Sequence, residues 1–153
     1  MNSGMDKNKA TDRVEKAVSC FQGGFSCSQA ILTTYGQDLG MDRATALKVS
    51  TPFGGGMARM GETCGAVTGA FMVIGLAYAV DKDSKEKTYA IVNKFVEKFK
   101  SRNGSISCKE LLGYNIGTPD GMKAVKEKGL ITTLCPKLVS DAAEILEEIL
   151  PQR

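Results

Sequence analysis

The sequence is organised around a glycine-rich loop that runs into a cysteine and an apolar stretch, PFGGGMARMGETCGAVTGA at residues 52–70. Glycine lets the backbone adopt positive φ angles and come close to another group. The start of a helix supplies free N–H groups and partial positive charge, which lower the pKa of a thiol placed there. Cys64, at the end of this loop, is therefore a candidate low-pKa thiolate with a catalytic role.

The composition is that of one globular domain. The chain has 153 residues, of which 42% are hydrophobic and 24% charged, a length that can bury a real core. The net charge of +3 is too small and too dispersed to predict a nucleic-acid partner. Histidine is absent, as is any C-x-x-C motif. Their absence excludes histidine-based catalysis, histidine metal ligands and the thioredoxin-like motif.

The sequence also bears on the compartment. The first ten residues are polar and charged, without the apolar region of a secretory signal. The longest apolar run, residues 66–80, is shorter than a membrane span and is interrupted by two glycines. We therefore expect a cytoplasmic protein with no membrane span. In a reducing compartment, cysteines serve more often as metal ligands or redox groups than in disulfides.

Apolar residues recur at helical spacing along almost the whole chain. The predicted helices cover residues 12–21, 26–36, 42–49, 64–80, 83–102, 107–113, 118–128 and 135–150. Only residues 130–134 form a short β-like run. We expect an all-α fold, a single-domain orthogonal helical bundle of about seven or eight helices over residues 10–151. Residues 1–9 are expected to form a flexible N-terminal tail.

Four of the five cysteines fall at predicted helix starts. Ser26 and Gln29 have capping-box spacing, as do Ser107 and Glu110. Pro136 suits the first position of the last helix, which would make the preceding cysteine its N-cap. The four cysteines at helix starts are Cys27, Cys64, Cys108 and Cys135. Cys20 instead lies late in the first predicted helix, beside the apolar stripe, as expected of a core-filling thiol.

If these four cysteines share a site, the repulsion between their thiolates must be removed. Each helix N-terminus stabilises an anion by roughly 0.3–1 kcal/mol, but four bare thiolates in contact would repel one another. A metal ion, a cluster or oxidation to disulfides would remove that repulsion. Four cysteines suit Zn²⁺ or an iron–sulfur cluster as the bound metal.

The loop itself offers further candidate cofactor-binding positions, Gly54, Gly55, Gly56, Arg59 and Gly65. The glycines with Arg59 could hold an anion such as phosphate, although the spacing is neither Walker A nor Rossmann. We favour a tight loop that lets the backbone approach the cysteine site. Arg59 could also balance thiolate charge or pair with Glu62. Gly65 and Gly69 predict close approach by a helix or bound group, or a homodimer interface.

The order of these residues resembles a known family. Cys27 is followed by GGGMARMGETCGAVTG at residues 54–69, then by Cys108 and Cys135. This pattern resembles the C_GCAxxG_C_C family of redox-active proteins, and the match runs from about residue 14 to residue 135. The resemblance implies that the four cysteines are the ones shared by the family. It also implies a redox role, as an oxidoreductase or an electron carrier.

Three functional hypotheses follow from the sequence. The first is a redox protein whose four cysteines bind an iron–sulfur cluster for electron transfer or redox sensing, with a redox protein as partner. The second is a metal-free thiol–disulfide protein in which Cys64 is the low-pKa thiol. The third is a zinc-holding interaction module.

Overall fold

The computed structural model describes residues 3–151, and this part of the chain contains helices and no strand. The α-helices are α1 Ser3–Gln22, α2 Cys27–Gly36, α3 Arg43–Ser50, α4 Gly54–Met57, α5 Gly65–Tyr78, α6 Lys85–Asn103, α7 Cys108–Leu112, α8 Pro119–Glu127, α9 Leu130–Thr133 and α10 Cys135–Ile149. Three 3₁₀ helices join them, η1 Gln37–Leu39, η2 Thr51–Phe53 and η3 Lys82–Ser84. Within this range α4 and α9 have only four residues each. The eight longer helices confirm the all-α prediction.

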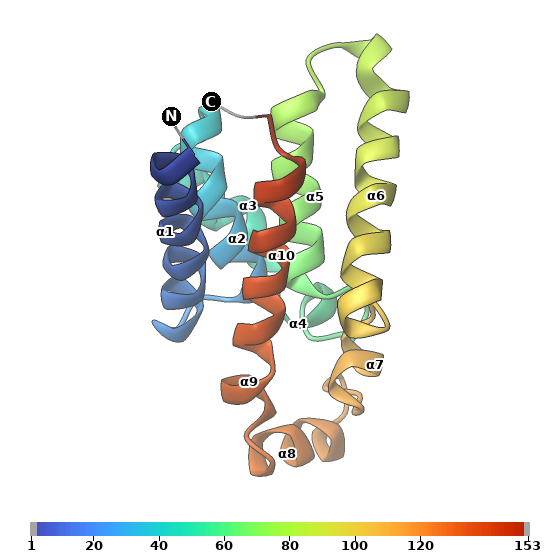
Figure 1. Ribbon diagram of the computed structural model, residues 1–153. Coiled ribbons are helices and arrows are strands. Elements are labelled where there is room, and N and C mark those ends of the chain that lie inside the picture. Colours follow the sequence, from blue (N-terminus) through green and yellow to red (C-terminus); the bar gives the residue numbers. More distant parts are fainter. Residues whose placement is uncertain (1–2, 152–153) are drawn as a thin grey trace.

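The long helices lie side by side, as Figure 1 shows. Helices α1, α2, α5 and α10 form the body of the bundle, and α6 packs against α5 and α10 on one side. The short helices α7, α8 and α9 gather beyond one end of α6 and α10, and α8 lies across that end. The chain therefore places α4 and the short helices α7, α8 and α9 towards the same end of the bundle.

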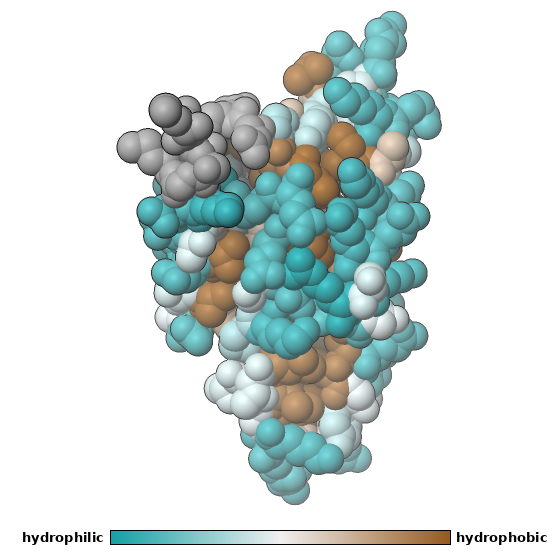
Figure 2. Space-filling model, in the orientation of Figure 1, coloured by the Kyte–Doolittle hydropathy of each residue, from teal (hydrophilic) through white to brown (hydrophobic). Residues whose placement is uncertain are grey.

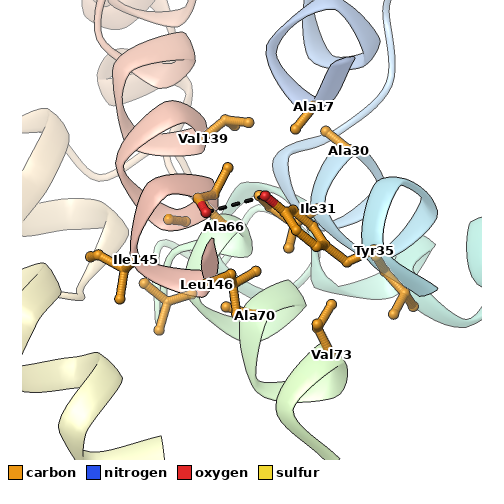
Figure 3. Close-up of a cluster of buried hydrophobic side chains, with 14 of the residues drawn as sticks. Ala17, Ala30, Ile31, Tyr35, Ala66, Ala70, Val73, Val139, Ile145 and Leu146 are labelled. Carbon is orange, nitrogen blue, oxygen red and sulfur yellow. Dashed lines mark hydrogen bonds between the residues drawn. The ribbon is translucent and has the colours of Figure 1, made fainter. Parts of the chain in front are cut away.

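The core lies between α2, α5 and α10. Ile31, Ala66, Val73 and Leu146 are fully buried there, and Figure 3 shows them converging from the three helices. Burial of apolar surface of this kind supplies roughly 25 cal/mol per Å². The hydroxyl of Tyr35 donates a hydrogen bond to a backbone carbonyl of α10 at 3.2 Å, drawn as the dashed line in Figure 3. The ring therefore packs in the core while its polar end is satisfied.

Several predicted helix starts are confirmed. Ser26 forms the capping box with Gln29, Asp42 accepts the N–H of Thr45 at 3.0 Å, and Thr118 accepts an N–H in the first turn of α8. Side-chain caps satisfy N–H groups that have no partner within the helix. The boundaries of α2, α3 and α8 therefore follow from local sequence.

Other helix boundaries differ from the predictions. The capping box at Ser107 is wrong, because the Glu110 carboxylate accepts a hydrogen bond from the Ser105 hydroxyl instead. Cys135 is the first residue of α10, and Leu134 is the N-cap. The β-like run at residues 130–134 is also wrong, since Leu130–Thr133 is the helix α9. Its packing against α8 and α10 overrides a weak β preference.

Helix α1 begins well before the expected start at residue 12. It includes residues 3–9, most of the segment that we expected to form a tail, while residues 1 and 2 lie outside the described range. The side of α1 that faces the bundle carries Ala17, which is fully buried. No helix in residues 3–151 has the length and apolar character that crossing a bilayer requires.

Candidate four-cysteine site

The glycine loop forms a left-handed turn. Five consecutive residues, Gly55 to Arg59, have positive φ angles, and three of them, Met57, Ala58 and Arg59, are not glycine. The left-handed helical conformation costs an L-residue roughly 1–2 kcal/mol. The turn is closed by hydrogen bonds from the N–H of Arg59 to the Gly54 carbonyl at 3.1 Å and from the N–H of Glu62 to the Gly56 carbonyl at 2.8 Å. Such strain persists only where surrounding contacts hold it, often next to functional groups.

Two glycines bring the loop and helix α5 against cysteines. A Cβ on Gly56 would lie 2.7 Å from the Cβ of Cys108 and 2.7 Å from the backbone nitrogen of Glu62. A Cβ on Gly65 would lie 3.2 Å from the Cβ of Cys27. Any side chain at Gly56 would therefore separate the loop from α7. The expectation that these glycines allow a close approach is confirmed at both positions.

Backbone hydrogen bonds hold Cys64 beside Cys108. The N–H of Cys64 donates to the Ile106 carbonyl at 2.8 Å, and the N–H of Cys108 donates to the Glu62 carbonyl at 2.6 Å. Thr63 and Ser107 form an antiparallel bridge between them. The two segments are more than forty residues apart in the sequence, so this pairing is a tertiary contact that spacing alone does not reveal.

The four cysteines at helix starts surround one cavity. Cys27, Cys108 and Cys135 are the first residues of α2, α7 and α10, and Cys64 is the N-cap of α5. All four line a cavity of about 270 Å³. Their thiols are free in this structure. Cys20 of α1 does not line the cavity. Its Sγ lies 3.7 Å from the hydroxyl oxygen of Thr33 in α2.

The thiols differ in their electrostatic environment. A hydrogen bond between the Cys27 thiol and the Cys135 sulfur lowers the pKa of Cys135 and raises the pKa of Cys27, which burial raises further. Burial raises the pKa of Cys108 to about 11. Of the four, Cys135 is therefore the thiol whose ionised form the structure favours.

The expected low pKa of Cys64 is wrong. The N–H groups of Ala66 and Val67 at the start of α5 do favour its thiolate, but the larger effect of burial raises its pKa to about 12. Cys64 is only 4% exposed. The partial charge of a helix N-terminus is worth about 1 kcal/mol, which is less than the cost of removing a thiolate from water.

Four of the five predicted loop residues lie at the cavity. Gly55, Gly56, Arg59 and Gly65 line the same cavity as the cysteines. Gly54 is not among its lining residues and packs against Ser26. The pairing of Arg59 with Glu62 is wrong, because the Glu62 carboxylate faces Lys109 at 3.4 Å.

The sequence did not predict the apolar and basic residues that form the rest of the cavity wall. Leu111, Ile116, Met122, Lys126 and Ile131 also line it. These residues belong to α7, α8, α9 and the turn between α7 and α8. Each looks like an ordinary residue of an amphipathic helix or a turn, so the sequence offers no signal that distinguishes them.

The possible metal ligands at this site are sulfur atoms. The thiols are its only sulfur groups besides Met122, and no carboxylate lines the cavity in residues 3–151. Within that range, no three cysteine or carboxylate side chains are gathered closely enough to hold a single metal ion. All four cysteines nevertheless line the same cavity.

These features define an all-α protein with four thiols facing a common, mostly apolar cavity. The model of a protein family described as "putative redox-active protein (C_GCAxxG_C_C)" matches residues 25–149. The match covers most of the chain, so the chain belongs to the C_GCAxxG_C_C family. No curated protein and no solved structure matches the chain.

Proposed function

We propose that this redox-family protein holds an iron–sulfur cluster on Cys27, Cys64, Cys108 and Cys135 and serves in electron transfer or redox sensing. The observation that carries the proposal is that these four thiols line one cavity. Four cysteine thiolates are the usual ligands of such clusters. When bound, a cluster would supply one-electron transfer.

The cavity favours a cluster over a single zinc ion. In a structural zinc site, four ligands surround one ion, with Zn–S distances of about 2.3 Å. Here the four thiols line one cavity, but no three cysteine or carboxylate side chains of residues 3–151 are gathered around a single point, an arrangement that suits a polynuclear group better. The N–H groups at the helix starts would stabilise negative charge on the sulfurs.

The experiment is anaerobic purification followed by iron and acid-labile sulfide analysis. The wild-type protein is expected to be brown and to contain both elements. Replacing Cys27, Cys64, Cys108 or Cys135 by Ser should remove most of the bound iron, and the matched control Cys20→Ser should retain it. A protein that stays free of iron after anaerobic reconstitution overturns the proposal. Stoichiometric zinc in the same analysis would instead support the zinc-holding module.

A second candidate function rests on the contact between Cys27 and Cys135. Their sulfurs are within hydrogen-bond reach, and both side chains are only partly buried. In a metal-free protein the Cys135 thiolate would attack an external disulfide, and the Cys27 thiol would then displace the second thiol of that substrate. The protein would gain an intramolecular disulfide, and the external disulfide would be reduced to two thiols.

Differential alkylation tests this second function. After exposure to a small disulfide, peptide mapping should show a bond between Cys27 and Cys135, while Cys64 and Cys108 stay alkylatable after unfolding. If no disulfide joins Cys27 and Cys135, the thiol–disulfide function is excluded for this pair.

A further inference from the structure

The outer part of the cysteine cavity is apolar and carries two cations. Leu111, Ile116, Met122 and Ile131 line it, together with Arg59 and Lys126. Figure 2 shows apolar side chains gathered between α7 and α9, above α8, with hydrophilic residues around them. Cavities that combine an apolar wall with a few charged groups are typical of sites for small organic molecules.

The two cations have no protein partner in residues 3–151. Arg59 and Lys126 are exposed and make no ion pair or hydrogen bond with a described side chain. Neighbouring lysines are engaged: Lys123 faces Glu127 at 3.9 Å, and Lys128 lies over the ring of Tyr114. No carboxylate from the same described part of the chain lines the cavity. No carboxylate of the cavity wall therefore offsets the positive charge of Arg59 and Lys126.

The left-handed turn directs Arg59 to this position. The Arg59 side chain passes over Gly55, since a Cβ on Gly55 would lie 2.8 Å from the Cγ of Arg59. Arg59 itself has a φ of 66°, a conformation that an arginine adopts at an energetic cost. Strained residues of this kind are concentrated at ligand sites and active sites.

We propose that this cavity binds a small organic anion with an apolar body, such as a medium-chain carboxylate. Its anionic group lies between Arg59 and Lys126, and its body contacts the apolar side chains of α7, α8 and α9. The inference rests on the proposed function only in that the same cavity contains the four thiols. It gives the redox site a ligand of defined chemistry in addition to a protein partner.

Calorimetric titration with octanoate tests the proposal on the full chain as purified anaerobically. Octanoate is expected to bind, and hexanoate, two methylenes shorter, should bind roughly fifteenfold more weakly, since each buried methylene contributes about a factor of four. Octylamine, which is cationic at pH 7, should bind at least tenfold more weakly than octanoate. Equal binding of octanoate and octylamine, or no binding at millimolar concentration, overturns the proposal.

Substitutions of Arg59 and Lys126 test whether these two cations bind the carboxylate of octanoate. Arg59→Gln and Lys126→Gln should each weaken octanoate binding about fivefold or more, and Arg59→Lys should preserve it. Lys123→Gln is the matched control on α8 and should leave the affinity unchanged; circular dichroism confirms that each variant is folded. If Arg59→Gln and Lys126→Gln bind octanoate like the wild type, the two cations merely offset thiolate charge and the inference fails. Iron and sulfide content is measured separately, so failure of the cluster proposal is distinguishable from failure of this one.

Discussion

At the scale of the residue, four cysteines in the same local position have different chemical states. Cys27, Cys64, Cys108 and Cys135 all begin a helix, and on that ground alone each would ionise easily. Burial reverses this for Cys64 and Cys108. The hydrogen bond between the thiols of Cys27 and Cys135 raises the pKa of Cys27 and lowers the pKa of Cys135. Helix position is a local property, but desolvation depends on everything packed around the sulfur.

The raised pKa values predict an alkaline loss of stability in the reduced, metal-free protein. In the folded state the pKa of Cys64 is about 12, against an ordinary value of 9.0. The folded state therefore favours the neutral thiol, and this stability is fully present below about pH 9 and is lost as the pH rises towards 12. Each pH unit in that window removes about 1.4 kcal/mol per affected thiol.

Urea unfolding at intervals between pH 7.5 and pH 10.5 measures this effect. The free energy of unfolding should fall above pH 9, and the fall should be less steep in Cys64→Ala. A Cys64→Ala protein with the same pH dependence as the wild type would show that the Cys64 thiol does not contribute.

At the scale of the element, α5 is built to lie close to α2. Gly69 faces α2, and a Cβ there would lie 3.1 Å from the Cβ of Ile31 and 3.1 Å from the Ser28 carbonyl oxygen. Gly75, two turns later in the same helix, has no neighbour within 4 Å of such a Cβ. The first glycine therefore has a packing role that the second lacks. Gly61, four residues before Gly65, precedes the helix, which begins at Gly65.

This difference predicts opposite effects for the same substitution within one helix. Gly69→Ala should destabilise the protein by about 1–3 kcal/mol, because α2 and α5 must move apart. Gly75→Ala should stabilise it by up to about 1 kcal/mol, because alanine is the better helix former. Urea unfolding of both variants is the measurement. Equal changes of the same sign would mean that α2 does not constrain Gly69.

At the scale of the whole molecule, one polar network joins the two ends of the chain. Glu147 of α10 accepts hydrogen bonds from Arg13 of α1 and, at 2.9 Å, from the hydroxyl of Tyr35 of α2. The Glu147 side chain is only 14% exposed, and Tyr35 is 2% exposed. Hydrogen bonds to a charged group in such surroundings are stronger than those at an open surface. The network fixes α1 and α2 against α10.

Removing the carboxylate should therefore destabilise the whole bundle. Glu147→Ala is expected to cost about 2–3 kcal/mol, because Arg13 loses its nearest carboxylate and the Tyr35 hydroxyl keeps only the longer of its two hydrogen bonds, to the Ala143 carbonyl. Glu127→Ala is the matched control, since its pair with Lys123 is exposed at 3.9 Å, and it should cost less than about 0.5 kcal/mol. Thermal and urea unfolding give both values. Similar losses in the two variants would show that the network adds no stability.

The sequence determined the class of fold and the identity of the candidate ligands. Helical periodicity and caps such as Ser26, Asp42 and Thr118 are local signals, and they placed most helices correctly. The association of Cys27, Cys64, Cys108 and Cys135 could be inferred because all four share a helix start and a family pattern. Cys20 was separated from them by the same reasoning.

Only the tertiary structure shows how these residues are arranged around the cavity and how burial changes their pKa values. It shows the left-handed turn at residues 55–59, which includes three non-glycine residues that no local preference predicts. It also places Lys126 and the apolar side chains of α7 to α9 around the thiols, and it raises the pKa of Cys64 where the helix start predicted a lower one. Periodicity and capping depend on neighbours a few residues apart. Burial, cavity lining and uncompensated charge depend on segments that only folding brings together.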